Sequence, residues 1–281
     1  DVAIAARDFR NGYTEQRLQD SIANGERLIS VQGEKVGQIN GLTVIELGEH
    51  AFGFPVRVTA RTYAGNEGLV NIEREVKLSG PIHDKGVLIL HSYLSALFSH
   101  IAPLALNASV VFEQEYSGVE GDSASCAELY ALLSSLSGLP LKQNIAVTGA
   151  VNQNGEILPV GGVNEKIEGF FRTCQTLGLD GTQGALIPRR NRQHLMLSPA
   201  VVEAVAQGQF HIYTADFASE GAELLMGVAF GENLRGGSYE AGSILSLADK
   251  TLQAYRRACH KEPTQDSRLL SRKILKQIGD K

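Results

Sequence analysis

The feature that most constrains this chain is the alternation of two hydrophobic periods along its length. Strand-like runs, such as 108–115, 144–151 and 185–187, are separated by runs with apolar residues every three or four positions, such as 124–136 and 167–177. Alternation of these two periods predicts strands and helices that interleave. We therefore expect an α/β (α+β) fold made of small mixed sheets with packed helices and a helical C-terminal tail.

Changes of composition predict three parts. Residues 1–27 are expected to be a helical remnant of a preceding module, because the chain opens on a helical pattern. Residues 28–231 form the main domain, in which the β-branched stretch 33–72 predicts a small twisted antiparallel sheet. Residues 232–281 are expected to form a polar, basic helical tail, because nine Lys and Arg residues against four Asp and Glu residues lie between Asp249 and Lys281. Such an excess is usually a solvated helix face.

Composition excludes several classes of protein. With 43% apolar and 20% charged residues, the chain is neither disordered nor fibrous. The longest apolar run, 87–97, is broken by His91 and Ser92 and falls short of the ~18 apolar residues of a membrane span. A net charge of −5 provides no general attraction for nucleic acid. The three cysteines lack a zinc-binding CxxC spacing and favour a reducing compartment, so we expect a cytoplasmic protein.

Familiar catalytic motifs are absent from the sequence. It has no GxxxxGK[ST] phosphate loop and no HExxH, GxSxG or SxxK motif. These absences exclude a nucleotide-binding P-loop, a zincin, a nucleophile-elbow hydrolase and a β-lactamase type of site. We therefore expect no metal and no cofactor in this chain.

One short turn could carry a nucleophile. The segment 120–125, Glu-Gly-Asp-Ser-Ala-Ser, delivers Ser123 to the first turn of an apolar helix. Backbone amides at a helix start have no intrahelical partner and could stabilise a developing oxyanion. Taken alone, however, Ser123 or Asp122 is better explained as a helix N-cap, since Ser and Asp are the commonest caps.

A nucleophilic serine needs a base, and Lys166 is the best candidate. None of the seven histidines stands in a recognisable triad context. A lysine can serve if burial lowers its pKa from ~10.4 towards neutrality. Lys166 begins the apolar helix, directly after a hairpin predicted for strands 144–151 and 156–160, which could bring it beside the serine turn. The alternative is a solvated first-turn lysine paired with an acid.

Several motifs in this order resemble one known family. They are Glu-Gly-Asp-Ser-Ala-Ser at 120–125, Ala-Val-Thr-Gly at 146–149, Gly-Glu-Ile-Leu-Pro-Val-Gly-Gly at 155–162 and Asn-Glu-Lys-Ile-Glu-Gly-Phe-Phe at 164–171. Together they resemble the proteolytic domain of Lon proteases, in its B-type branch. The segments 36–42 and 80–86 also resemble that domain, so that the similarity covers roughly residues 7–231.

The resemblance implies roles for individual residues. Ser123 is the expected nucleophile and Lys166 the general base, 43 positions later in the chain. Thr148 matches a threonine whose hydroxyl contacts the catalytic lysine, although its β-branched side chain would also suit a strand. Asp122 fits the B-type branch. Its carboxylate either pairs with Lys166, raising the lysine pKa and silencing it, or caps the helix.

The resemblance also implies a function and partners. We expect a serine endopeptidase that degrades unfolded or damaged polypeptides through a Ser-Lys dyad, assembled as a homo-hexameric ring. ATP would act only through an AAA+ ATPase module, fused or separate, and neither a membrane nor nucleic acid is an expected partner. The alternative is a catalytically silent Lon-like assembly module, in which Asp122 keeps Lys166 protonated.

Overall fold

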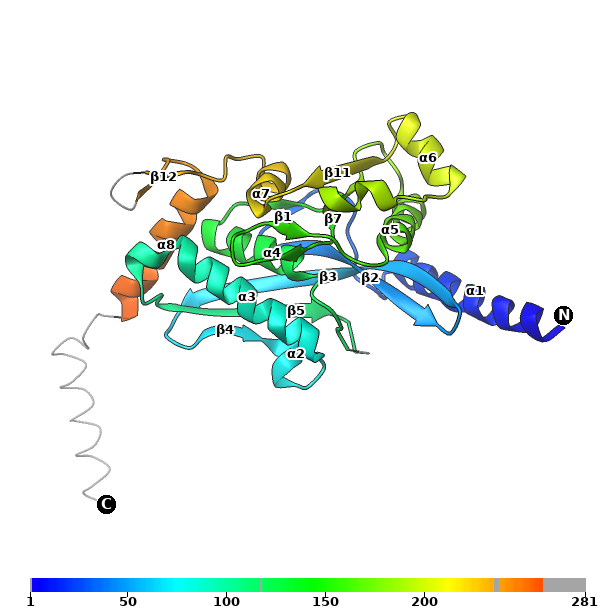
Figure 1. Cartoon of the computed structure of the whole chain (residues 1–281), viewed down its shortest axis with the longest axis horizontal. Helices are drawn as coiled ribbons and strands as arrows, with labels where there is room; N and C mark the ends of the chain where they lie inside the picture. Colours follow the sequence, from blue (N-terminus) through cyan, green and yellow to red (C-terminus); the bar gives the residue numbers. More distant parts are fainter. Residues whose placement is uncertain (1, 117, 235–237, 260–281) are drawn as a thin grey trace, which may run out of the picture.

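The computed structural model describes residues 2–116, 118–234 and 238–259, with side chains from residue 12 onward. Its centre is a seven-stranded sheet with helices packed around it (Figure 1). The helices are α1 Val2–Ala23, α2 Ile72–Glu75, α3 Pro81–Leu97, α4 Ser125–Ser137, α5 Val163–Leu177, α6 Pro199–Ala206, α7 Ala218–Met226 and α8 Ile244–Cys259. The sheet strands, in spatial order, are β11 His211–Ala215, β10 Gly184–Pro188, β7 Ile145–Val147, β2 Gln38–Leu47, β3 His50–Ala64, β5 Leu106–Glu113 and β4 Gly68–Asn71.

The sheet is mixed. β11, β10, β7 and β2 run parallel, β2, β3 and β5 are antiparallel neighbours, and β4 runs parallel to β5. The predicted α/β class is confirmed. The stretch 33–72 does not form a small sheet of its own, because Asn40 and Gly41 of β2 pair with Ala146 and Val147 of β7. Strand β2 therefore joins the parallel part of the sheet to the antiparallel part.

Three short strand pairs of the described residues lie outside this sheet. They are β1 Glu34–Lys35 with β6 Leu141–Lys142, β8 Ala150–Val151 with β9 Ile157–Leu158, and β12 Asn233–Leu234 with β13 Ser238–Tyr239. Strands β8 and β9 form the predicted hairpin, with the amide of Gly155 donating to the carbonyl of Asn152 in its turn at 3.0 Å. The hairpin is shorter than expected, because the predicted strand 144–151 is interrupted after Val147 and its first part, β7, pairs with β2 and β10 in the main sheet.

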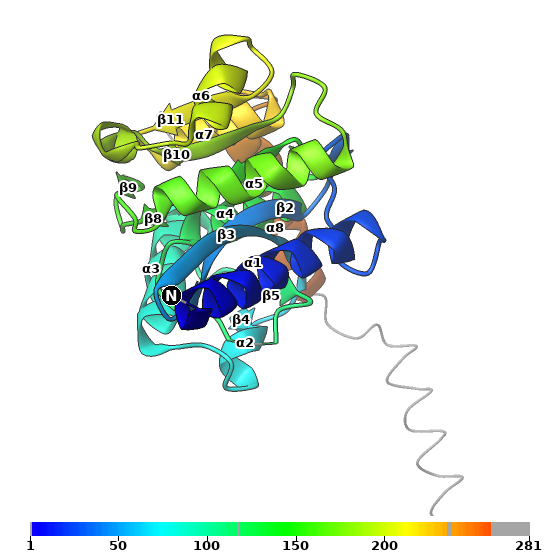
Figure 2. The same ribbon diagram turned by 90° about the vertical axis from the view of Figure 1, so that its right-hand side faces the viewer.

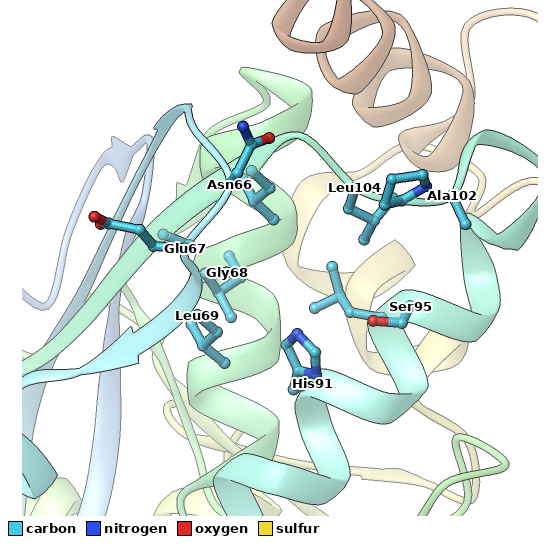
Figure 3. Close-up of a pocket in the computed structure, with 13 residues that line it drawn as sticks. Asn66, Glu67, Gly68, Leu69, His91, Ser95, Ala102 and Leu104 are labelled. Carbon is cyan, nitrogen blue, oxygen red and sulfur yellow. The ribbon is translucent and has the colours of Figure 1, made fainter. Parts of the chain in front are cut away.

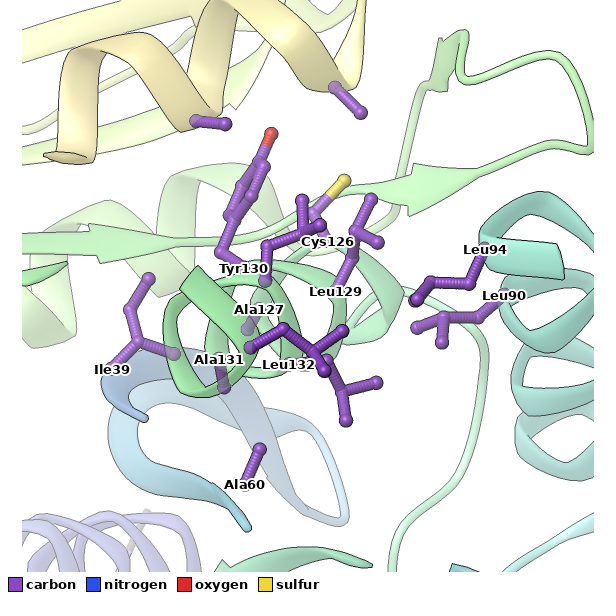
Figure 4. Close-up of a cluster of buried hydrophobic side chains, with 14 of the residues drawn as sticks. Ile39, Ala60, Leu90, Leu94, Cys126, Ala127, Leu129, Tyr130, Ala131 and Leu132 are labelled. Atoms are coloured by element: carbon purple, nitrogen blue, oxygen red, sulfur yellow. The ribbon is translucent and has the colours of Figure 1, made fainter. Parts of the chain in front are cut away.

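The core is built around α4. In Figure 4, Leu90 and Leu94 of α3 reach towards α4 from one side, and Ile39 and Ala60 approach it from β2 and β3. The helix is buried around almost its whole circumference, and Glu128 and Ser134 are buried together with its apolar residues. The turn immediately before α4 is therefore attached to a helix that is buried along almost its whole length.

Helix α8 differs from the polar tail that we expected. It packs beside α4, and Ile244, Ala248 and Leu252 are buried in the same core (Figure 1). A solvated face with Arg256 and Arg257 remains on its last turn. The rest of the expected tail, residues 260–281, lies outside the described residues. The domain boundaries at residues 27 and 231 stay predictions.

Helix α5 packs on β2 and β3, and α1 lies alongside both α5 and β3 (Figure 2). Ile167, Phe170 and Phe171 of α5 form a second core cluster with Phe210. None of the described helices is both long and apolar enough to cross a membrane.

Candidate active site

Ser123 lies in the turn before α4. The helix begins at Ser125, and its N-cap is Ala124, with no side-chain capping bond. The expectation that Ser123 belongs to the first helical turn, or that Ser123 or Asp122 caps the helix, is therefore wrong. The first helical amides are also occupied, since Ser125 N donates to Asp122 O and Cys126 N donates to Gly149 O, both at 3.1 Å. These two amides are not available to an oxyanion.

Lys166 lies in the first turn of α5 and is only 4% exposed. Its Nζ atom is 2.9 Å from Ser123 Oγ and 3.1 Å from Thr148 Oγ1. Burial lowers the pKa of Lys166 to about 8, while the negative charges of Asp122 and Glu165 oppose that shift. The structure thus brings together the two residues predicted as nucleophile and base, and burial favours the free amine that a base requires.

Thr148 joins this pair directly after β7. Its amide donates to the carbonyl of Leu186 in the neighbouring strand β10 at 3.1 Å, which continues the sheet. Its hydroxyl donates to the carbonyl of Ser123 at 3.2 Å. Because the only hydroxyl hydrogen of Thr148 is used in that bond, its oxygen is left to accept from Lys166 Nζ. This arrangement leaves the lone pair of a neutral Lys166 amine for Ser123 Oγ.

Asp122 takes neither of the two roles that we considered, an ion pair with Lys166 or the N-cap of α4. Among the ion pairs of the described residues, none joins Asp122 to Lys166. Its carboxylate acts on Lys166 only through its charge, which raises the lysine pKa less than burial lowers it. The backbone of Asp122 has a clearer task, since its carbonyl accepts hydrogen bonds from both the amide and the hydroxyl of Ser125.

Two glycines that the sequence analysis did not single out set the position of Lys166. A Cβ atom on Gly53 of β3 would lie 1.9 Å from the carbonyl oxygen of Glu165, and one on Gly169 would lie 1.9 Å from the carbonyl oxygen of Gly53. Helix α5 and strand β3 therefore touch backbone to backbone. The only signal in the sequence was a glycine inside an apolar helical stripe, which is not specific.

A cleft of about 790 Å³ opens in front of Ser123 and Lys166. Ser123 and Lys166 both line it, together with strand residues 43–46, Gly118 and the two segments 120–122 and 159–162. The pairing of β2 with β7 ends at Gly41, so the strand residues in the cleft pair only with β3. A smaller pocket of about 40 Å³ adjoins Ser123 and is lined by Leu42, Val56 and Phe112, among others.

Another pocket, of about 340 Å³, lies between α3, β4 and residues 102–106 (Figure 3). His91 and Ser95 line it, but its lining contains no lysine or cysteine. Within the described part of the chain, no group of three or more His, Cys, Asp and Glu side chains could hold a metal ion. The cleft in front of Ser123 is therefore the best candidate for an active site.

Comparison with known proteins points to the same segment of the chain. The family model for the Lon protease (S16) C-terminal proteolytic domain matches residues 116–216, which include Ser123, Thr148 and Lys166. Two bacterial relatives are named as Lon protease homologues: one from Escherichia coli is 43% identical over 82% of this chain, and one from Haemophilus influenzae is 43% identical over 80%. An archaeal Lon protease from Thermococcus kodakarensis is 31% identical over 68% of this chain.

These relatives are longer than the present chain. The chain spans 39% of each of the two bacterial proteins and 29% of the archaeal one. The similarity thus applies to the domain rather than to the whole of a relative. In residues 116–216 the chain carries a Lon-type proteolytic domain.

Proposed function

We propose that this chain is a serine endopeptidase domain in which Ser123 and Lys166 cut polypeptide substrates. One observation supports this function most strongly: a lysine that is 4% exposed has its Nζ atom 2.9 Å from a serine hydroxyl at the wall of a cleft. A buried amine with a pKa of about 8 is uncharged in about a tenth of molecules at pH 7. That fraction is large enough for general-base catalysis.

In the first half of the reaction, Ser123 Oγ attacks the scissile carbonyl carbon while its proton moves to Lys166 Nζ. The backbone N–H groups of the turn 121–124 are our candidates for stabilising the resulting oxyanion, because the next two amides are occupied. When the C–N bond breaks, Lys166 returns the proton to the leaving amine, and an ester on Ser123 remains.

In the second half, Lys166 takes a proton from a water molecule whose oxygen attacks the ester carbonyl. The C–Oγ bond then breaks, and the proton passes from Nζ to Ser123 Oγ, which restores the starting state. Thr148 would hold the amine so that its lone pair keeps pointing at Ser123 throughout, without adding a charge.

The cleft favours an extended polypeptide as substrate. Residues 43–46 offer a strand edge whose side towards the cleft is not paired with β7, and an added strand is a common way to bind a peptide. The small pocket beside Ser123 has Glu115 and Glu120 in its lining as well as Leu42, Val56 and Phe112, and its apolar part would take a small apolar side chain next to the scissile bond. An unfolded or damaged protein presents such extended segments, whereas a folded one does not.

A serine-reactive fluorophosphonate probe tests the proposed function. We expect wild-type protein to be labelled at Ser123 and Ser123→Ala to remain unlabelled, because the probe requires an activated hydroxyl. Absence of labelling in folded wild-type protein would favour the alternative, a catalytically silent assembly module. Cleavage of a short unstructured peptide should also continue in the presence of EDTA and without ATP, since we propose that neither takes part in the chemistry.

We further propose that the domain works in a homo-hexameric ring with an ATP-driven unfolding module. The greater length of the relatives is consistent with further modules beside this domain. Light scattering coupled to size-exclusion chromatography would measure the mass of the assembly. A monomer at all concentrations would contradict the ring.

A further inference from the structure

Three buried polar side chains lie behind the turn of residues 121–124 that presents Ser123, here called the nucleophile turn, and none of the three lines the cleft. Asn71, His83 and Glu128 are 3%, 1% and 2% exposed. They come from three different places in the chain: the N-cap of α2, the first turn of α3 and the first turn of α4. The proposed mechanism uses none of them, although Glu128 follows Ser123 by only five residues.

Hydrogen bonds determine which nitrogen of His83 carries the hydrogen. The Oδ1 atom of Asn71 accepts from the amide of Arg74 at 3.1 Å, which fixes the orientation of the Asn71 amide group. Its Nδ2 atom then donates to Glu128 Oε1 at 3.1 Å and lies 3.2 Å from His83 Nε2. An amide nitrogen only donates, so His83 Nε2 accepts and the ring hydrogen is on Nδ1.

This ring is connected to the nucleophile turn. His83 makes a hydrogen bond with the backbone of Gly121, two residues before Ser123. One helical turn further along α3, a Cβ atom on Gly86 would lie 3.2 Å from both Asp122 Cβ and Ser125 Oγ. Helix α3 therefore contacts both ends of the turn that presents Ser123.

Burial keeps this network uncharged near neutral pH. Desolvation raises the pKa of Glu128 to about 8, with a smaller contribution from the charge of Glu73. Desolvation lowers the pKa of His83, opposed by the charges of Asp84 and Glu120 and by the bond to Gly121. His83 Nε2 is also 3.7 Å from Glu128 Oε1, so Asn71 is the group that joins them.

We propose that His83 is a positioning residue for Ser123: Asn71 fixes its ring in the Nδ1–H form, and the ring holds the Gly121 carbonyl and thereby the turn that presents Ser123 to Lys166. The proposal rests on the proposed function, because it takes Ser123 as the nucleophile. His83 lies in segment 80–86, one of the stretches that resemble the Lon domain, but the sequence assigned it no role.

Three substitutions of His83 test the proposal. The side-chain amide of His83→Asn can donate from nearly the position of Nδ1, whereas His83→Gln places its amide nearer to Nε2, and His83→Leu removes the donor. His91→Leu, an exposed histidine on the same helix, is the matched control. For each variant, kcat and KM on a short fluorogenic peptide are measured together with the melting temperature.

We expect His83→Leu and His83→Gln to lower kcat by about 10- to 100-fold with little change in KM, because misplacing a reacting group by about 1 Å has effects of this size. His83→Asn should restore most of kcat. Wild-type kcat in His83→Leu would overturn the proposal. Equal losses of kcat in His83→Asn and His83→Gln, each in proportion to the drop in melting temperature, would also overturn it. Loss of packing would then be enough to explain the lower activity.

The tautomer can be measured without any activity. In ¹⁵N NMR spectra of histidine-labelled protein, the His83 signal, assigned by its absence from His83→Asn, should show hydrogen on Nδ1. Hydrogen on Nε2 would overturn the proposal even in an active enzyme. If folded wild-type protein is not labelled by the fluorophosphonate, the proposed function fails, and the NMR result still decides whether His83 is held as described.

Discussion

The two sides of the nucleophile turn contain buried ionisable groups in similar surroundings, yet they differ in what those groups can do. In front, Lys166 is 4% exposed and its pKa falls to about 8. Behind, Glu128 is 2% exposed and its pKa rises to about 8. Burial drives both groups towards their neutral forms, because a low dielectric disfavours charge of either sign. A shifted pKa alone therefore does not identify the catalytic side.

The partners of these groups make the difference. Lys166 contacts two hydroxyl groups, which can both give and accept a proton, and it lines an open cleft. Glu128 and His83 are joined through the amide of Asn71, which cannot pass a proton on at ordinary pH. In the proposed mechanism the front therefore moves a proton to the substrate, whereas we propose for the back only that it holds the turn in place.

Removing the nucleophile should have the largest effect. Ser123→Ala should lower kcat by at least about 10³-fold, because both halves of the reaction need its hydroxyl. Ser125→Ala is the matched control, since its hydroxyl points to the carbonyl of Asp122 rather than to Lys166. Peptide cleavage by the purified variants measures both. If Ser125→Ala abolished cleavage and Ser123→Ala did not, the assignment of the nucleophile would be wrong.

Removing the base should have an effect almost as large. Lys166→Arg and Lys166→Met should both be inactive, because a guanidinium stays protonated and a thioether cannot accept the serine proton. Lys166→Met keeps the apolar stem, so its melting temperature separates loss of the base from loss of the fold. In the wild type, kcat/KM should rise with pH and level off above an apparent pKa near 8. A flat profile from pH 6 to 9 would contradict a lysine base.

Substitution of Thr148, which contacts Lys166, should have an intermediate effect on activity. Thr148→Val keeps the β-branched shape but loses the bonds to Lys166 and to the Ser123 carbonyl. We expect kcat/KM to fall by roughly 10- to 1000-fold. Thr148→Ser should retain much of the rate, because it keeps the hydroxyl. Wild-type activity in the valine variant would show that Thr148 is only a strand-end residue.

The smallest effect is expected for Glu128, behind the turn, and it is an effect on thermal stability rather than on activity. Because its folded pKa of about 8 lies above the ordinary 4.5, Glu128 stabilises the fold below pH 4.5, and this contribution is lost as the pH rises to 8. Glu128→Gln cannot ionise but keeps an acceptor for Asn71. Melting temperatures measured between pH 5 and 8.5 should therefore fall more steeply in the wild type than in the variant. Parallel curves would mean that Glu128 is not protonated in the fold.

The sequence was sufficient to predict the α/β class, the β8–β9 hairpin and the helix that carries Lys166. These features depend on local patterns: alternating apolar residues, an Asn-Gly turn and an apolar stripe every three or four positions. Pairings between distant segments were predicted less well. Strands β2 and β3 were expected as a separate sheet, because nothing local in residues 33–72 specifies the pairing of Asn40 with Ala146.

The candidate site shows the same division. Ser123, Thr148 and Lys166 were predicted from motifs in the sequence, and the sequence also indicated that Lys166 needed an apolar setting. The tertiary structure alone decided the helix start at Ser125 rather than Ser123, the occupied amides of Ser125 and Cys126, and the direct backbone contact at Gly53. Residue types and the local spacing of apolar residues can be obtained directly from the sequence. Distances between side chains and their burial arise only when segments far apart in the chain pack together.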